Sequence, residues 1–250
     1  MARNWLFGVY AIALFLILGL GALLALLLLP GIGRRRAMAR RISRGYLSLA
    51  AMPVTVVNAE RLPATQCVVV ANHASYLDGV VFTAALPPRF GFVIKREMNS
   101  VPLAGLLLRR LGSEFVERFN RNRGAADARR VMRNATNGSS LVFFPEGTFT
   151  RTPGLLKFHI GAFVIAARAG CPIVPAVVRG TRHALSPQGG LPRASKIEIT
   201  ILPPIQPPPA SPTAAAALRD RARAAILSEL GEPDLTYSDD TDRPPGTALG

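Results

Sequence analysis

The sequence predicts an α/β fold in which a mainly parallel sheet is flanked by helices, with a membrane-anchoring helical segment at the N-terminus. From residue 53 onward, short runs rich in β-branched residues alternate with helical patterns. This order is typical of parallel strands joined by helices. A hydrophobic content of 49% supplies a core. Residues 5–29 contain no charged side chain, and a helix of that length can cross a bilayer.

Residues 1–52 are predicted to anchor the chain at a membrane. A signal peptide is the alternative for residues 5–29, but the apolar stretch is too long and lacks a small-x-small cleavage site. Residues 34–52 are predicted to form a basic interfacial helix, because arginines alternate there with apolar residues. The arginines of this segment are Arg34, Arg35, Arg36, Arg40, Arg41 and Arg44. Their position favours anionic headgroups and, by the positive-inside bias, places the remaining chain on the cytoplasmic side of the inner membrane.

Residues 53–230 are predicted to form the globular domain. Hydrophobic periodicity and the residues typical of helix ends indicate its strands and helices. Strands are expected at residues 54–57, 67–71, 90–95, 113–117, 141–144, 173–178 and 197–202. Helices are expected at residues 101–111, 125–137, 158–169 and 213–230, with one more starting at Ser75. Residues 231–250 are rich in proline, glycine and aspartate, a composition that predicts a disordered acidic tail.

The charge and cysteine content limit the possible partners. A net charge of +15 calls for an anionic partner, such as nucleic acid, a membrane surface or a phosphorylated substrate. The chain has no basic–aromatic nucleic-acid motif, so anionic membrane lipids are expected and nucleic acid is not. Cys67 and Cys171 lie in or beside apolar runs without metal-ligand spacing. They are interpreted as buried thiols, and no metal site is expected.

A first group of polar residues follows the apolar run at residues 68–71. His73 comes just after this predicted strand, at the sheet edge where open α/β sheets bind ligands. Ser75 and Asp78 have capping-box spacing, so Asp78 would lie in the first helical turn within reach of His73. A histidine held by a carboxylate can act as a general base toward a hydroxyl. Taken alone, the same residues also fit a loop histidine beside a helix cap.

A second group follows the predicted strand at residues 141–144. Pro145, Glu146, Gly147 and Thr148 come directly after it, and Arg151 follows. Gly147 allows an unusual backbone angle or the close approach of a ligand. An arginine at this sheet edge suits bidentate phosphate binding. Taken alone, the segment also fits a simple turn.

Four sequence blocks together resemble the glycerolipid acyltransferases, which include bacterial 1-acylglycerol-3-phosphate acyltransferases and their lysophospholipid relatives. The first and third blocks are Asn72-His73-x-x-x-x-Asp78 and Phe144-Pro145-Glu146-Gly147-Thr148. The second and fourth blocks are Gly112-x-x-Phe115-Val116-x-Arg118 and Ile173-Val174-Pro175-Ala176-Val177. Lys95, Pro102 and Gly105 also match the family pattern. The resemblance covers residues 53–204, and four blocks in order are far more specific than one.

The resemblance implies a membrane-bound enzyme that moves a fatty acyl group from acyl-CoA or acyl-carrier protein to a lysophospholipid. The acceptor would be the free hydroxyl of 1-acylglycerol-3-phosphate, and the product phosphatidic acid. No cofactor is implied beyond the acyl donor as co-substrate. His73 would be the general base and Asp78 its orienting partner. The residues implied in acceptor binding are Lys95, Arg118, Glu146, Gly147, Thr148 and Arg151.

Two residues depart from the family pattern. Glu114 stands at a usually apolar position of the second block, which affects how Arg118 is placed. Phe149 follows Thr148 where many phosphatidate-forming members carry a basic residue. Another lyso-lipid or an acylated amino-acid lipid therefore remains an alternative acceptor.

A function of a different class is also open, namely that of a non-catalytic basic protein that binds the membrane surface. For residues 5–29, length favours a span, whereas the resemblance favours an embedded helical pair.

Overall fold

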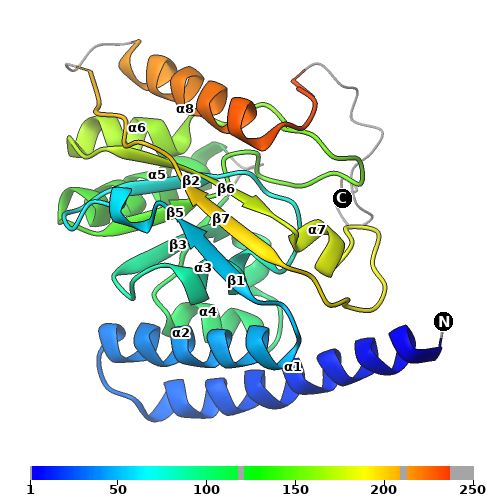
Figure 1. Cartoon of the computed structure of the whole chain (residues 1–250). Helices are drawn as coiled ribbons and strands as arrows, with labels where there is room; N and C mark the ends of the chain where they lie inside the picture. Colours follow the sequence, from blue (N-terminus) through cyan, green and yellow to red (C-terminus); the bar gives the residue numbers. More distant parts are fainter. Residues whose placement is uncertain (1, 118–120, 209–212, 237–250) are drawn as a thin grey trace.

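A seven-stranded sheet in the order β1-β7-β6-β2-β5-β3-β4 forms the centre of the computed structural model (Figure 1). The structure describes residues 2–117, 121–208 and 213–236. Each of the seven predicted strands is present, within about two residues of its expected bounds. The strands are β1 (Val54–Val57), β2 (Val68–Ala71), β3 (Phe90–Lys95), β4 (Glu114–Val116), β5 (Ser140–Phe143), β6 (Ile173–Arg179) and β7 (Ile197–Ile201).

The sheet is mainly parallel, as predicted. The pairs β1–β7, β2–β6, β2–β5, β3–β5 and β3–β4 are parallel, and only β6–β7 is antiparallel. Strands β1 and β7 therefore run opposite to the other strands. Because β2, β5, β3 and β6 share one direction, the loops that follow them meet at one edge of the sheet. This edge carries both polar groups that the sequence singles out.

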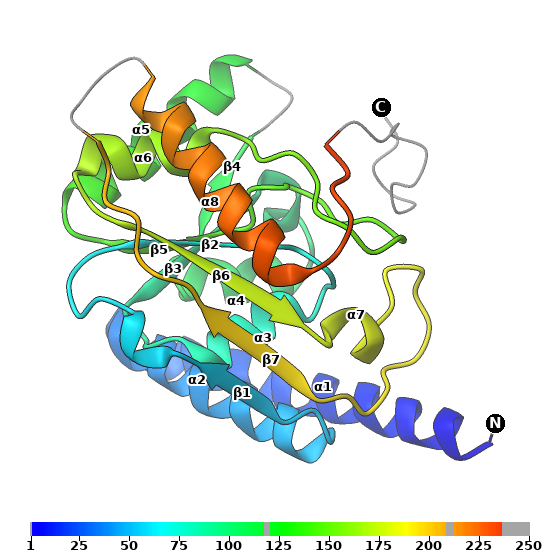
Figure 2. The same ribbon diagram turned by 45° about the horizontal axis from the view of Figure 1, so that its top comes forward.

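Helices cover both faces of the sheet (Figures 1 and 2). On one face lie α2 (Ile32–Leu49) and α3 (Asp78–Ala85), with α1 (Ala2–Leu28) outside α2. The other face carries α5 (Arg121–Thr136), α6 (Gly161–Ala169) and α8 (Ala214–Leu230). A hydrophobic core lies on each face of the sheet, and β2 contributes to both because successive side chains of a strand point to opposite faces. Val68 and Val70 belong to one core, whereas Val69 and Ala71 belong to the other. The remaining short elements are η1 (Ala59–Arg61), η2 (Arg96–Asn99), α4 (Ala104–Arg110) and α7 (Thr181–Ala184).

Helix α3 begins three residues later than the capping-box pattern predicts. Ser75 does not open the helix, because its hydroxyl donates to the Leu185 carbonyl at 2.8 Å and accepts from the Leu77 amide at 3.2 Å. Asp78 nevertheless makes the reciprocal contact of a capping box, as its carboxylate accepts from the Ser75 amide at 3.0 Å. The segment between β2 and α3 is thus a hydrogen-bonded turn that presents His73 at the sheet edge.

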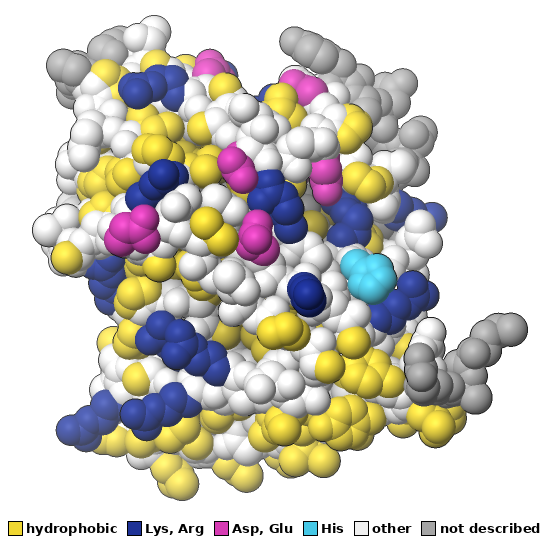
Figure 3. Space-filling view, in the orientation of Figure 1, with side chains coloured by type: hydrophobic (Ala, Val, Ile, Leu, Met, Phe, Trp, Pro, Cys, Tyr) yellow, Lys and Arg dark blue, Asp and Glu magenta, His cyan; other side chains and the backbone are white. Residues whose placement is uncertain are grey.

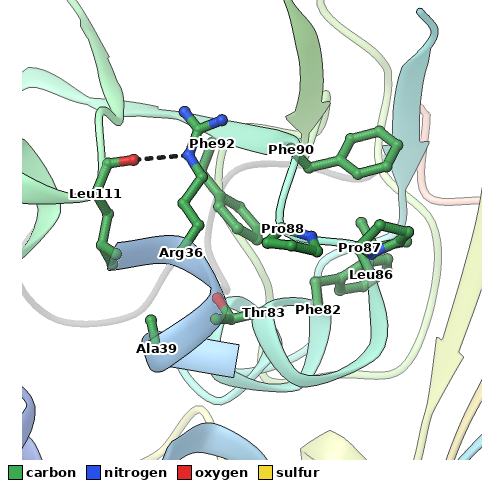
Figure 4. A pocket seen from close by; sticks show the side chains of 10 residues that line it. All are labelled: Arg36, Ala39, Phe82, Thr83, Leu86, Pro87, Pro88, Phe90, Phe92 and Leu111. Atoms are coloured by element: carbon green, nitrogen blue, oxygen red, sulfur yellow. Dashed lines mark hydrogen bonds between the residues drawn. The ribbon is translucent and has the colours of Figure 1, made fainter. Parts of the chain in front are cut away.

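Several arginines of α2 bind the globular domain. Arg36 donates to the carbonyls of Leu111 and Arg89, at 2.9 Å each. It closes one side of a small pocket lined by Phe82, Phe90 and other apolar residues (Figure 4). Arg40 and Arg44 donate to carbonyls at the end of α3, where a cation also complements the helix dipole. The basic cluster expected to contact headgroups is therefore used partly to dock α2.

Residues 231–236, which the sequence assigns to the C-terminal tail, contact the globular domain. Glu232, Pro233 and Leu235 hydrogen-bond to the loop that follows the Pro-Glu-Gly-Thr segment. Leu155 and Asp234 form an isolated parallel bridge. Residues 237–250 lie outside the described part of the chain.

Candidate active site

His73 and Asp78 form a close pair at the carboxyl edge of the sheet. The two side chains meet at 2.7 Å between His73 Nδ1 and Asp78 Oδ2. The same carboxylate oxygen accepts from the backbone amides of Ala74 and Ser75, at 2.7 and 3.0 Å. Asp78 is fully buried, whereas the His73 side chain keeps 20% of its surface exposed. A carboxylate on Nδ1 leaves Nε2 as the nitrogen available to a substrate.

Two phenylalanines enclose the His73 ring. Phe144 stacks on it with ring centroids 4.5 Å apart and planes 19° apart. Phe149 meets it at 4.6 Å in an edge-to-face arrangement, and the exposed Tyr76 packs against Phe149 in turn. The imidazole is therefore held by packing as well as by Asp78. Phe149, singled out in the sequence as a departure from the family pattern, is a direct neighbour of the histidine.

Glu146 holds the backbone of His73 from the neighbouring strand. Its Oε1 accepts from the His73 amide at 2.6 Å, and its Oε2 accepts from the Leu156 amide at 2.9 Å. Burial raises the pKa of Glu146 to about 8, against the lowering effect of these two amide donors. With one oxygen on each amide, the Glu146 carboxyl connects the turn that carries His73 to the loop at Leu156.

The other expected site residues are distributed around the same edge. Gly147 has a φ of 77° and donates to the Phe144 carbonyl, which confirms that this turn needs a glycine-type backbone. Thr148 is half-buried and Arg151 is exposed in the loop after β5. Lys95 is half-buried and ends β3, two strands from β2. Arg118 lies outside the described residues.

Glu114 has a structural role. Its carboxylate accepts from the Arg130 guanidinium at 3.0 Å and from the Asn134 side-chain amide. Arg130 and Arg96 also bind the buried Asp127. This network joins β4 to α5, which explains why a charged residue occupies a usually apolar position of the second block.

Sequence reasoning missed Arg182, which lies next to this site. Its guanidinium donates to the Thr150 carbonyl at 2.5 Å and approaches the Glu232 carboxylate at 3.7 Å. It also lowers the pKa of Glu146 by its positive charge. No local pattern marks Arg182, because its partners are far away in the sequence. The one signal that points to Arg182 is its place in the sequence: it follows β6, and β6 ends at the same edge of the sheet.

The fold and the close pair of His73 and Asp78 define an α/β protein with a polar site at the carboxyl edge of a parallel sheet. Similarity to known proteins specifies the class. A family model described as Acyltransferase matches residues 53–179, about half of the chain. The chain belongs to this acyltransferase family.

Curated relatives are named 1-acyl-sn-glycerol-3-phosphate acyltransferases. The Saccharomyces cerevisiae protein is 30% identical over 200 residues, which are 78% of this chain and 65% of that protein. The Haemophilus influenzae protein is 32% identical over 123 residues, or 49% of this chain and 51% of that protein. The chloroplastic BAT2 protein of Brassica napus is 32% identical over 152 residues, 59% and 44% of the two chains. The chain thus spans less than two thirds of each relative.

A solved structure shares the fold. The crystal structure of the 1-acyl-sn-glycerophosphate (LPA) acyltransferase PlsC from Thermotoga maritima superposes with a TM-score of 0.70. The match covers 91% of this chain and 95% of that chain at 22% sequence identity. The coverage extends the likeness well beyond the family-model match, so most of the α/β architecture is common to both proteins.

Proposed function

We propose that the protein is a membrane-bound 1-acylglycerol-3-phosphate O-acyltransferase that forms phosphatidic acid. The observation that carries the proposal is the pair of His73 and Asp78, in which the Asp78 carboxylate is fully buried whereas the His73 imidazole keeps part of its surface exposed. The shared name of the relatives supports this acceptor. Acyl-CoA or acyl-carrier protein would supply the acyl group as a thioester, and no cofactor is required.

The reaction would be a direct transfer. His73 Nε2 takes the proton from the acceptor hydroxyl while the hydroxyl oxygen attacks the thioester carbonyl. Asp78 fixes the imidazole tautomer through Nδ1 and stabilises the imidazolium that forms. Collapse of the tetrahedral intermediate expels the thiolate, which recovers the proton from His73. The ester bond of the product replaces the thioester bond of the donor, and the hydroxyl proton ends on the thiol. No acyl-enzyme intermediate is needed.

The acceptor phosphate would lie near the loop after β5. Arg151 and Thr148 offer a cation and a hydroxyl there, and Gly147 lets the backbone turn sharply. Lys95 at the end of β3 would add a second cation from the same edge of the sheet. Arg118 belongs to this group by its place in the second sequence block. Guanidinium groups suit phosphate because they donate two parallel hydrogen bonds.

We further propose that α1 and α2 lie in the plane of the membrane, within the cytoplasmic leaflet of the inner membrane. Among the described residues, α1 is the single helix long and apolar enough to span a bilayer. However, it runs beside α2 and also packs against α4. Hydrophobic side chains cover the lower edge of the molecule, where α1 lies (Figure 3). An apolar face of this kind suits partial insertion, with anionic headgroups near the exposed arginines of α2.

The decisive experiment is thiol release from palmitoyl-CoA by purified protein in detergent with lysophosphatidic acid as acceptor. His73→Ala should remove turnover, because no other group would take the hydroxyl proton. His183→Ala, which removes an exposed histidine on α7, is the matched control and should retain it. Substantial turnover by a folded His73→Ala protein contradicts the proposed base. Activity with acyl-carrier protein in place of CoA identifies the donor.

A second acceptor is favoured by Phe149. An aromatic side chain beside His73 supplies no charge to a phosphate, so a lyso-lipid or acylated amino-acid lipid with another headgroup is the alternative. A panel of lyso-lipids under the same assay separates the two. Lysophosphatidic acid should give the highest kcat/KM, and a higher value for another lyso-lipid would replace it as the acceptor.

A further inference from the structure

We propose that residues 231–236, here called the C-terminal strap, help to position the base of the proposed acyl transfer. The C-terminal strap holds the loop of residues 154–156, this loop holds Glu146, and Glu146 holds the backbone of His73. The residues of the strap would then be positioning residues for catalysis. Each link is a hydrogen bond, and the bonds from the strap to the loop and from Glu146 to His73 join segments more than 70 residues apart in the sequence.

The first link joins the C-terminal strap to the loop. The Leu155 amide donates to the Pro233 carbonyl at 2.9 Å, and the Leu235 amide donates to the Leu155 carbonyl at 3.0 Å. The Gly154 amide donates to the Glu232 carboxylate at 2.6 Å. The loop and the strap therefore pair over a short distance around the isolated bridge of Leu155 and Asp234, here called the ladder, and these bonds fix the backbone of both segments.

Arg223 of α8 fixes both sides of this ladder. Its guanidinium donates to the Asp234 carboxylate through two nitrogens, at 3.0 and 2.5 Å. The same group donates to the carbonyls of Leu155 and Leu156, at 2.8 and 3.0 Å. One guanidinium thus binds the strap and the loop together, using the planar donor geometry that lysine lacks.

The second link joins the loop to the base. The Leu156 amide donates to Glu146 Oε2 at 2.9 Å, one residue after the ladder. Glu146 Oε1 accepts from the His73 amide at 2.6 Å. Since Glu146 is buried, solvent does not replace a donor that moves away. Arg182 adds a parallel connection, because it contacts the Thr150 carbonyl and Glu232.

The joint between strap and loop is tightly packed. Gly154 has a φ of 147°, and a Cβ built there would clash with the Leu235 side chain. The loop backbone therefore approaches the strap as closely as a glycine permits. Loss of the strap would free the Leu156 amide and, through Glu146, the turn that carries His73. A displacement of about 1 Å at a reacting group can lower a rate by about a hundredfold.

The test uses the full-length chain with Glu232→Ala and Asp234→Ala combined. Asp220→Ala is the matched control, because it also removes an exposed carboxylate that binds an arginine of α8, namely Arg219. Amide hydrogen exchange of the peptides containing His73 and Leu156 is measured together with kcat and KM. We expect faster exchange in both peptides and a kcat lowered by about tenfold or more, with KM unchanged. Asp220→Ala should resemble the wild type in all three.

The outcomes separate this inference, which rests on the proposed function, from that function itself. If the wild type transfers no acyl group to any acceptor, the proposed function fails, and the exchange data alone decide the role of the strap. Faster exchange at Leu156 but not at His73 overturns the proposed path, as does an unchanged kcat. If the double variant does not fold, Asp234→Asn replaces it, because this substitution keeps the shape of the side chain. Asp234→Asn must then show faster exchange in both peptides and a lower kcat, each by a smaller amount.

Discussion

At the scale of single residues, His73 is constrained on its ring nitrogen, its ring faces and its backbone. Asp78 holds Nδ1, Phe144 and Phe149 hold the ring, and Glu146 holds the backbone amide. The general-base role proposed for His73 would need this fixed geometry, because proton transfer depends on a short and aligned hydrogen bond. Three different segments of the chain supply these contacts, so the geometry exists only in the folded protein.

Phe149 is predicted to stabilise the charged form of His73 during turnover. An aromatic ring beside a cation contributes about 0.5 to 2 kcal/mol, which corresponds to a kcat change of about twofold to thirtyfold. Phe149→Leu fills the space without the aromatic ring and should lower kcat by this amount. Phe149→Tyr retains the ring and serves as the control. Equal kcat values for the wild type and the Leu variant at saturating substrates would contradict this role.

Glu146 is predicted to make the folded protein less stable as the pH rises. Burial raises its pKa from 4.5 to about 8, so between these values the unfolded chain loses a proton that the folded protein keeps. Stability conferred by the protonated form is complete below pH 4.5 and falls through this window by about 1.4 kcal/mol per pH unit.

Glu146→Gln has no proton to lose, which makes it the reference for this effect. Urea unfolding of both proteins in detergent between pH 5 and pH 9 gives their unfolding free energies. The stability of the wild type relative to the variant should decline with rising pH and level off above about pH 8. A difference that stays constant over this range would show that Glu146 does not titrate as expected.

At the scale of elements, α2 is docked by its arginines as well as by its apolar face. Arg36 donates to the carbonyls of Leu111, Arg89 and Gly112, and burial lowers its pKa. Arg36→Leu removes the donor from these partly buried acceptors and should lower the unfolding free energy by about 1 to 3 kcal/mol. Arg41→Leu, at an exposed position of the same helix, should change it little. Equal stabilities of the two variants by chemical denaturation would contradict the docking role.

The elements also mark the limit of what the sequence predicts. The strands were predictable because each is a short β-branched or apolar run, and the shared edge of β2 and β5 followed from parallel pairing. The start of α3 was misplaced because the Leu185 carbonyl, a distant partner, binds the Ser75 hydroxyl. The hydrogen bonds of Glu146 and of the C-terminal strap are also not visible in the sequence. Their contacts link segments tens of residues apart, and composition alone made residues 231–236 resemble a disordered tail.

At the scale of the whole molecule, the N-terminal helices and the active-site edge belong to one body. Helix α1 buries Ala11, Ala22, Leu23 and Leu26 against its neighbours. The Arg110 guanidinium donates to the Leu27 carbonyl at 2.6 Å, and Phe15 packs on Tyr46 of α2. A spanning α1 would either leave these contacts or draw the arginines of α2 into the bilayer. The second alternative costs about 2.5 to 3.5 kcal/mol for each arginine at the bilayer centre.

An in-plane α1 is therefore predicted to have both ends on the cytoplasmic side. Asn4→Cys and Arg34→Cys place single thiols near the two ends of α1, and Asp220→Cys reports the side of the globular domain. Cys67 and Cys171 can remain, because both are buried and burial raises the pKa of each thiol, for Cys67 to about 11. Reconstituted vesicles are treated with a membrane-impermeant maleimide before and after lysis.

All three introduced thiols should react in the same fraction of molecules before lysis, since they share one side of the membrane. A spanning α1 would instead place Asn4→Cys opposite to Asp220→Cys, so that the two labelled fractions would add up to the whole population. The wild-type chain should remain unlabelled in both conditions, which checks that its own thiols are shielded. The in-plane arrangement has a direct consequence for the reaction. The site edge would stay at a fixed height above the leaflet that contains both the acceptor lipid and its product.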